Sequence, residues 1–225
     1  MAKSSKDVKR FIVLGLGTFG TAIAARLSKN GCRVTGVDAN ERQVEALTHT
    51  LYEAVVADVT DRHVLQELSL PDADAVIISL GEQIERSILA ALHARECGAR
   101  HIYAKGVSDE HGKILKALGV ERVIFPEAEI ATQLADNFTW PNVLNFLQVD
   151  PEYSIIEIAV PQTLLGKTLQ EADLRKKFNV YILAVKDALQ GNLQGIPHGE
   201  FRLNDDQLLL VIGKHSDLAR FRDLV

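Results

Sequence analysis

Several features that mark common classes of protein are scarce or absent in this 225-residue chain. It has only two cysteines, Cys32 and Cys97, whose separation fits neither a metal site nor a redox pair. No apolar run approaches the roughly 20 residues of a membrane-spanning helix, and the residues before Phe11 lack the apolar core of a signal peptide. We therefore expect a soluble globular protein of the cytoplasm.

Basic clusters and catalytic signatures are missing as well. The formal net charge is −5 with no basic cluster, so no nucleic-acid partner is expected. None of the seven histidines has the HxxxH or HExxH spacing of a metal site, and no G-x-S-x-G motif or cysteine–histidine pairing marks a nucleophile. We therefore predict that the chain is not an enzyme.

The most informative stretch that is present covers residues 11–27. An apolar strand pattern leads into Gly15-x-Gly17-x-x-Gly20, and a helical pattern follows. Gly15 permits a tight turn, Gly17 lets the backbone approach a phosphate, and Gly20 allows the helix to pack closely on the strand. The first N–H groups of such a helix point at a bound anion. The pattern predicts a site for the phosphates of a nucleotide.

An acid follows the second strand pattern, at the place where dinucleotide-binding domains hold a ribose. The apolar run over residues 34–37 ends in Asp38, 18 residues after Gly20. A carboxylate there accepts a hydrogen bond from a ribose 2′-hydroxyl and repels a 2′-phosphate. NADP is therefore a poor candidate, whereas NAD(H), ATP, ADP and AMP all remain open.

Short apolar runs rich in β-branched residues alternate with stretches of helix length between residues 11 and 125. Six such runs predict an α/β fold, a Rossmann-type doubly wound parallel sheet covered by helices on both faces. Residues 126–149 carry apolar side chains at helical spacing on either side of Pro141, which predicts helix, kink and helix. The aromatic residues Phe138, Trp140 and Phe146 favour exchange of this segment with a second subunit, or contact in a dimer.

The last 75 residues, after Asp150 and Pro151, change character. Strand patterns cover residues 154–160, 180–185, 200–203 and 207–212, helical patterns cover 168–178 and 216–224, and residues 190–199 indicate a hairpin or loop. This is the pattern of a small α+β domain. We expect a Rossmann nucleotide-binding domain over residues 9–135, a helical linker over 136–150, and the α+β domain over 151–225.

Polar side chains follow later strands of the predicted sheet, where open α/β sheets bind ligands. Asp58, Ser79, Lys105 and Glu127 each come just after a predicted strand. Asp58 could accept a hydrogen bond from an adenine amino group, Lys105 could offset phosphate charge, and Glu127 could hold a divalent cation that bridges phosphates. The alternative is that each of them caps a helix or is solvated.

Several motifs together are more specific than the glycine pattern alone. They are GLGTFG at 15–20, VDAN at 37–40, ADVTD at 57–61, ISLGEQIERSI at 78–88, YAKG at 103–106 and ALGVERVIFPE at 117–127, with SIIEIAVPQTLLGKTLQEADLRKKFNVYILAV at 154–185. With these motifs the chain resembles the RCK (KTN) family, built from a TrkA-N and a TrkA-C (RCK-C) domain, and in particular the cytosolic gating subunits of Ktr/Trk-type potassium uptake systems. The resemblance covers nearly the whole chain.

The resemblance implies a non-enzymatic switch. Dimers would form an octameric ring, bind ATP or ADP, with NAD or NADH as further family ligands, and dock on a membrane-embedded ion-translocating subunit at the inner face of the cell membrane. ATP would favour the conducting state and ADP the closed state. Carried over to this chain, the nucleotide site comprises Gly15, Gly17, Thr18, Phe19, Gly20, Asp38, Ala39, Asn40, Asp58, Val59, Ser79, Leu80, Gly81, Lys105, Gly106, Val107, His111 and Glu127.

Two of these positions concern the γ-phosphate. By resemblance, Glu127 corresponds to a family acid that helps to bind a cation there, Mg²⁺ or Ca²⁺. Thr18 stands where the family commonly has an arginine that is associated with sensing this phosphate. Threonine keeps a hydroxyl donor but lacks the positive charge. Either Lys105 and a metal compensate for this loss, or the chain prefers a different nucleotide.

The resemblance also points to a second ligand in the C-terminal domain. Some relatives bind cyclic di-AMP there, at a dimer interface. The matching positions, which would form the cyclic-dinucleotide site, are Leu169, Asp173, Arg175 and Ile182. Tyr181 stands where an asparagine is frequent. The alternative is that this stretch is an ordinary helix and strand.

Two other functions stay open at this point. The glycine pattern and Asp38 are compatible with a small NAD-dependent oxidoreductase or a redox sensor, which hydride exchange with a substrate would reveal. A ring of the same fold could instead regulate a cation/proton antiporter or another channel, because no motif specifies the docking surface.

Overall fold

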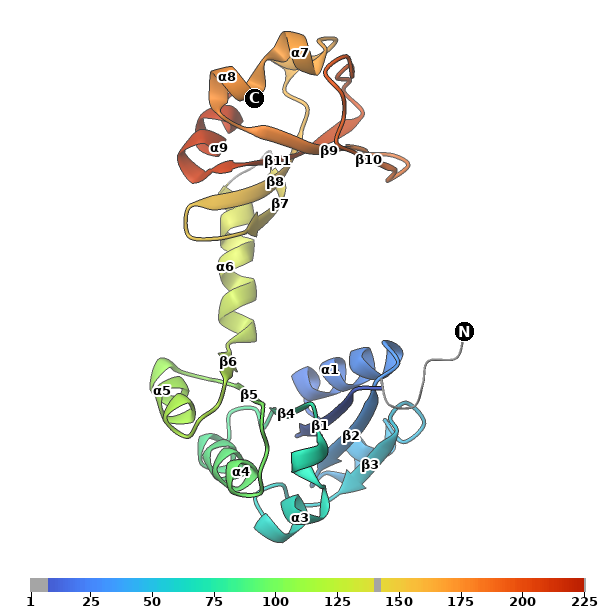
Figure 1. The fold of residues 1–225 in the computed structure, drawn as a ribbon, viewed down its shortest axis with the longest axis vertical. Coiled ribbons are helices and arrows are strands. Elements are labelled where there is room, and N and C mark those ends of the chain that lie inside the picture. Colours follow the sequence, from blue (N-terminus) through green and yellow to red (C-terminus); the bar gives the residue numbers. More distant parts are fainter. Residues whose placement is uncertain (1–7, 140–142, 225) are drawn as a thin grey trace. The chain divides into compact units, whose positions relative to one another are not determined.

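The computed structural model describes residues 8–139 and 143–224 (Figure 1). The pattern of internal contacts divides the chain into two compact units, one ending at Pro126 and one beginning at Glu127. Each unit has its own hydrophobic core. Among the described residues, none of the helices combines the length and the hydropathy that a membrane span requires.

The first unit contains a parallel sheet with the strand order β3-β2-β1-β4-β5-β6. The sheet grows from β1 to β3 on one side, and β4 to β6 are added on the other side of β1. This reversal of the strand order confirms the predicted doubly wound Rossmann fold. In chain order, the elements are β1 (Arg10–Leu14), α1 (Thr18–Lys29), β2 (Arg33–Asp38), α2 (Glu41–Glu45), β3 (Glu53–Val56), α3 (Arg62–Glu67), β4 (Ala75–Ile78), α4 (Ile84–Glu96), β5 (Ile102–Lys105), α5 (Asp109–Ala117) and β6 (Arg122–Ile124).

Helices cover both faces of this sheet, and Figure 1 shows α1 and α4 on opposite sides of it. Ile12 and Ile78 lie in one core layer with Ala91 of α4. Val13 lies in the other layer with Ala24 of α1. Because successive side chains of a strand point to opposite faces, uninterrupted apolar runs fill both layers.

The stretch predicted as helix, kink and helix is a helix followed by a strand. Residues after β6 form α6 (Pro126–Thr139), but residues 143–148 form β7 (Val143–Gln148), which pairs antiparallel with β8 (Tyr153–Ala159). The prediction of a second helix is therefore wrong. Pairing with β8 across a short connection satisfies the backbone N–H and C=O groups of β7 that face β8. The predicted kink at Pro141, and Trp140, lie outside the described residues.

The second unit contains a sheet with the order β10-β9-β11-β8-β7, antiparallel throughout. The helices α7, α8 and α9 cover one of its faces (Figure 1), and Leu174, Leu218 and Phe221 from α8 and α9 pack on Ile156 and Leu209 from the strands. This arrangement confirms the predicted small α+β domain. Besides α6, β7 and β8, its elements are α7 (Leu169–Ala172), α8 (Leu174–Phe178), β9 (Tyr181–Asp187), β10 (Leu193–Gly195), β11 (Gln207–Lys214) and α9 (His215–Arg222).

Two details of this unit differ from the predictions. Residues 200–203 form no strand and contribute only an isolated bridge between Arg202 and Thr168, whereas β10 forms a hairpin with β9 inside the stretch 190–199. The predicted helix over residues 168–178 is broken into α7 and α8 at Asp173, whose φ is +48°. A left-handed residue ends a helix, and aspartate tolerates this conformation better than most residues do.

Candidate functional site

A cleft of about 510 Å³ lies at the carboxyl ends of the strands of the parallel sheet, at the switch point between β1 and β4. Ligands of doubly wound sheets bind at this place. The structure brings seven of the predicted site residues together there, and adds Glu82, Gln83 and Arg86, which sequence reasoning did not select. The ten residues that line the cleft are Gly17, Asp38, Ala39, Val59, Ser79, Leu80, Gly81, Glu82, Gln83 and Arg86.

The glycine loop connects β1 to α1 as predicted. Gly15 has a φ of +96°, and a Cβ there would collide with the carbonyl oxygen of Ser79. A Cβ on Gly20 would collide with the carbonyl oxygen of Gly15, so both glycines are required for close backbone packing. Gly17, the residue that precedes α1, has nothing within 4 Å of the position of a Cβ. Gly17 therefore leaves space at the amino end of α1, where helix N–H groups attract an anion.

Asp38, the last residue of β2, holds the glycine loop in place. One carboxylate oxygen accepts a hydrogen bond from the backbone N–H of Leu16 at 2.6 Å, and the other accepts one from the N–H of Asn40 at 2.8 Å. An ionised carboxylate can accept about four hydrogen bonds, so Asp38 retains acceptor capacity toward the cleft. A ribose hydroxyl and the glycine loop can therefore share this carboxylate.

Asp58 and Arg86 form an ion pair beside the cleft. Asp58 Oδ1 accepts hydrogen bonds from the backbone N–H of Thr60 at 2.9 Å, the Thr60 hydroxyl at 2.8 Å and Nη2 of Arg86 at 2.7 Å. These donors lower the pKa of the Asp58 carboxyl, the Thr60 N–H most of all, and keep it ionised at neutral pH.

The side chain of Asn40, another predicted site residue, accepts a hydrogen bond from the N–H of Arg42, so Asn40 caps α2.

The predicted residues after β5 do not line this cleft. Lys105 ends β5, and a Cβ on Gly106 would collide with the ring of Phe125, so Gly106 is required for packing. His111, in the first turn of α5, is only 1% exposed, and neither ring nitrogen has a hydrogen-bond partner among the described residues. Burial lowers the pKa of His111 and favours the neutral ring. Leaving the buried ring of His111 without a hydrogen-bond partner costs free energy.

Glu127 is exposed and lies in the first turn of α6, at the start of the second unit. No group of three histidine, cysteine, aspartate or glutamate side chains gathers as a metal site within residues 8–139 and 143–224. A cation at Glu127 would therefore need further ligands besides these side chains.

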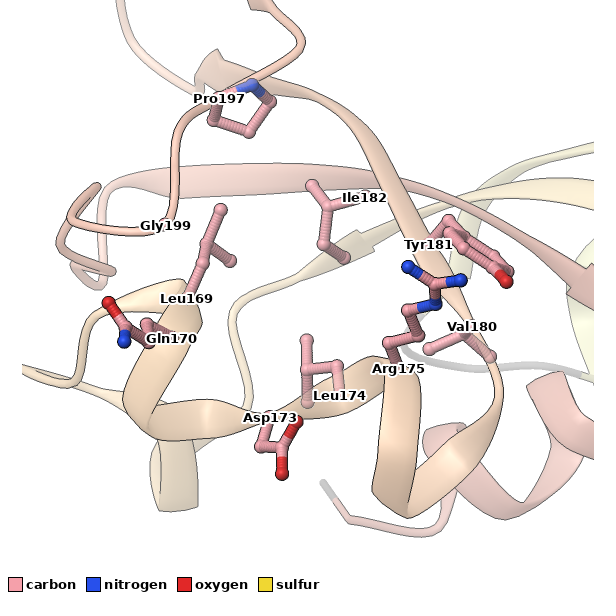
Figure 2. A pocket seen from close by; sticks show the side chains of 10 residues that line it. All are labelled: Leu169, Gln170, Asp173, Leu174, Arg175, Val180, Tyr181, Ile182, Pro197 and Gly199. Atoms are coloured by element: carbon pink, nitrogen blue, oxygen red, sulfur yellow. The ribbon is translucent and has the colours of Figure 1, made fainter.

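A second pocket, of about 590 Å³, lies in the second unit between α7, α8 and β9 (Figure 2). All four residues predicted for a cyclic dinucleotide line it: Leu169, Asp173, Arg175 and Ile182. The guanidinium carbon of Arg175 lies 5.2 Å from the centre of the Tyr181 ring, a cation–π contact. The pocket thus combines apolar walls with one arginine held in place by an aromatic ring.

The comparisons with known proteins agree with this architecture. A family model of the TrkA-N domain matches residues 11–126, and a model of the TrkA-C domain matches residues 154–225. The chain is 35% identical to the Ktr system potassium uptake protein C of Bacillus subtilis (strain 168), over 96% of this chain and 97% of that protein. The chain belongs to the TrkA-N and TrkA-C family of potassium uptake proteins.

Other members of the family are almost as similar to this chain. The Ktr system potassium uptake protein A of Bacillus subtilis (strain 168) is 32% identical over 96% of each chain. The protein of the same name from Vibrio alginolyticus is 31% identical over 94% of this chain and 95% of that protein.

Among solved structures, the GsuK channel superposes with a TM-score of 0.69 at 22% identity, over 99% of this chain and 40% of that chain. The crystal structure of the GsuK RCK domain superposes with a TM-score of 0.67 over 99% of this chain and 48% of that chain. The present chain therefore spans less than half of the length of the GsuK chains. At 22% identity, this likeness shows a shared fold.

Proposed function

We propose that this chain is a nucleotide-binding regulatory subunit of a Ktr/Trk-type potassium uptake system. The observation that carries the proposal is the cleft at the switch point, with Gly17 and Asp38 in its lining, in a chain so similar to Ktr potassium uptake proteins along its whole length. Its partner is a membrane-embedded ion-translocating subunit, which would hold this chain at the inner face of the membrane.

ATP and ADP are the proposed ligands, with NAD or NADH as the alternative. The cleft offers helix N–H groups for phosphates and a carboxylate for ribose, which all these nucleotides require. A structural neighbour with a TM-score of 0.64 is the GsuK channel bound to NAD. At 21% identity this neighbour makes NAD a candidate that has to be tested beside ATP and ADP.

The surface of α6 supports assembly with a second copy of the chain. Ile130, Leu134 and Phe138 repeat every four residues along this helix and are 55%, 47% and 80% exposed. A second surface that covers such an apolar stripe on a helix of 14 residues stabilises the helix. We therefore propose a homo-oligomer, dimers in an octameric ring, in which α6 contacts the neighbouring subunit.

Oligomerisation also gives the switch its strength. A ligand shifts a conformational equilibrium only by its differential affinity for the two states, and a 100-fold difference supplies about 2.7 kcal/mol per site. Several sites in a ring add their contributions. In this proposal ATP favours the conducting state and ADP the closed state, and no covalent chemistry is needed.

The binding part of the proposal is tested by calorimetric titration of the chain with ATP, ADP, AMP, NAD and NADH, each with and without Mg²⁺ or Ca²⁺. Asp38→Ala is expected to weaken binding at least tenfold, the equivalent of about 1.4 kcal/mol. Asp74→Ala is the matched control. Asp74 precedes β4, at the amino ends of the strands and so away from the cleft, and its carboxylate accepts a hydrogen bond from the N–H of Arg10. Metal sensitivity that disappears in Glu127→Gln would support the cation role of Glu127.

Gating needs a second assay with the membrane partner. Potassium flux through vesicles that hold a Ktr-type translocating subunit and this chain is expected to be faster with ATP than with ADP. Equal flux with both nucleotides would contradict the gating proposal, and NAD-dependent hydride transfer would favour an oxidoreductase. If the chain instead co-purifies with an antiporter, the fold is the same and the partner is different.

The pocket of Figure 2 favours a second ligand, a cyclic dinucleotide such as cyclic di-AMP, because all four predicted residues line it. Titration with cyclic di-AMP is expected to give saturable binding that Arg175→Ala abolishes. Lys176→Ala is the control, since the side chain of Lys176 is 84% exposed and does not line the pocket. Equal loss of binding in both variants would point to non-specific electrostatic attraction.

A further inference from the structure

Arg86 is a cleft residue that stands inside the motif at 78–88, but the sequence predicted no role for it. It lies in the first turn of α4, which follows β4, and its guanidinium reaches Asp58, which follows β3. Asp58 is fixed in turn by the N–H and hydroxyl of Thr60. The pair therefore ties the loop after β3 to the first turn of α4, and Arg86 lines one wall of the cleft.

The strand order places this wall at the base end of a bound nucleotide. The glycine loop follows β1, Asp38 ends β2 and Asp58 follows β3, and these three strands are neighbours in the sheet. Adjacent strands lie about 4.8 Å apart, so the end of β3 lies about 10 Å from the end of β1. Phosphates at β1 and a ribose at β2 direct the base toward β3.

The charges of the cleft single out Arg86 as well. Among the described residues that line the cleft, Arg86 is the only cation, and the acids are Asp38 and Glu82. The Arg86 guanidinium donates a hydrogen bond to Oδ1 of Asp58 through Nη2 at 2.7 Å. An arginine whose edge is fixed by a carboxylate has a flat face that stacks well on an aromatic ring.

We propose that Arg86 recognises the base of the nucleotide by stacking its guanidinium face on the ring, with Asp58 holding the guanidinium in position. This inference rests on the proposed function and deepens it, since it assigns the base end of the ligand to the Asp58–Arg86 wall. The ligand class is a nucleotide whose aromatic base contributes to affinity, beyond its phosphates and ribose.

The test compares ADP with inorganic pyrophosphate as probes, by competition against a fluorescent ADP analogue. Arg86→Ala is expected to weaken ADP about tenfold and to leave pyrophosphate unchanged. Arg86→Lys keeps the charge but lacks the planar face, so ADP is expected to stay weak. Arg62→Ala is the matched control, because Arg62 of α3 also pairs with a residue of α4, Glu96 at 3.3 Å, and lies outside the cleft lining.

Three results would overturn the inference. If Arg86→Ala weakens the binding of pyrophosphate as much as that of ADP, and Arg86→Lys restores both affinities, Arg86 is a counterion for the phosphates. ADP affinity unchanged in Arg86→Ala, or lowered equally in Arg62→Ala, would leave Arg86 a structural residue. If the unmodified chain binds neither ADP nor NAD, the proposed function fails together with this inference, whereas every other outcome leaves the proposed function intact.

Discussion

The two units of this chain build pockets from different parts of their structure. In the first unit the cleft is formed by loops at the ends of parallel strands, and backbone groups and small residues such as Gly17 and Gly81 make up much of its lining. In the second unit the pocket is lined by residues of two short helices and the antiparallel strand β9, with Pro197 and Gly199 from the loop after β10. The first pocket depends on its glycine loop as well as on side chains such as Arg86, whereas the second depends mainly on its side chains.

This difference determines which substitutions each pocket tolerates. A backbone-built cleft is sensitive to an added Cβ at a glycine and depends on the strands being in place. A side-chain-built pocket keeps its shape when a single surface residue changes, but its affinity for a ligand changes. The units also differ in burial, because helices cover both faces of the first sheet but one face of the second.

The largest expected effect would separate the stabilities of the two units. Phe221 is fully buried in the core of the second unit, where its ring meets that of Phe178 edge to face at 5.8 Å. Phe221→Ala is expected to destabilise this unit by about 3–5 kcal/mol. Calorimetric unfolding should show one lowered transition while ADP still binds. Loss of ADP binding below that transition would contradict the independence of the cleft.

A smaller effect is expected from a pair of glycine variants. Gly20→Ala places a methyl group against the carbonyl oxygen of Gly15 and is expected to destabilise the first unit by about 1–3 kcal/mol. Gly17→Val adds a side chain to open space, so stability should stay within about 1 kcal/mol of the unmodified chain while nucleotide binding is lost. Thermal unfolding and ADP titration check both. Equal stability of the two variants would contradict the close packing of the loop.

The buried ring of His111 predicts a pH dependence of the first unit. Burial lowers the pKa of His111 in the folded state, so the unfolded chain, with a pKa of about 6.5, binds a proton more readily. The contribution of His111 to the free energy of unfolding is therefore fully present above about pH 6.5. It decreases as the pH falls below this value, by at most about 1.4 kcal/mol per pH unit. His111→Phe should flatten this slope in denaturant unfolding, and His49→Gln, an exposed control, should not. An unchanged slope in His111→Phe would contradict the assignment.

The smallest effect concerns the exposed Asp58. Hydrogen bonds from Thr60 first, and the pairing with Arg86, lower the pKa of its carboxyl, so its stabilising contribution is present above about pH 3.8 and is lost as the pH falls further. Because the pair is solvent-accessible, Asp58→Asn is expected to cost less than about 1 kcal/mol at pH 7. Denaturant unfolding at pH 7 and pH 3 measures it. A loss of stability in Asp58→Asn that is larger at pH 3 than at pH 7 would contradict the predicted direction of this pH dependence.

Local patterns were enough to predict the first unit. Gly15, Gly17 and Gly20 stand at a fixed local spacing between a strand and a helix, so the sequence pattern reveals them even though Gly15 packs against Ser79 and Asp38 binds the N–H of Leu16 across the sheet. The six apolar runs identified the strands because strands buried on both faces need no alternation. Gly17, Asp38 and Ser79 followed from the strand pattern, whereas Ala39 and Val59 came from the resemblance and Glu82 and Gln83 were not predicted.

Features that depend on distant partners could not be predicted in the same way. Apolar residues at 143, 144, 146 and 147 fit either a helix or an edge strand, and pairing with β8 selects the strand. Arg86 became visible only through Asp58, 28 positions away in the chain. The burial of His111 depends on the packing of α5 on the sheet, which no motif describes.

The most direct test of nucleotide binding at the switch point is calorimetric titration of ADP into three proteins: the unmodified chain, Gly17→Val and Arg175→Ala. The expected result is saturable binding to the unmodified chain and to Arg175→Ala, and no binding to Gly17→Val. ADP binding that survives in Gly17→Val, or that Arg175→Ala removes, would place the nucleotide in the pocket of the second unit and contradict this account.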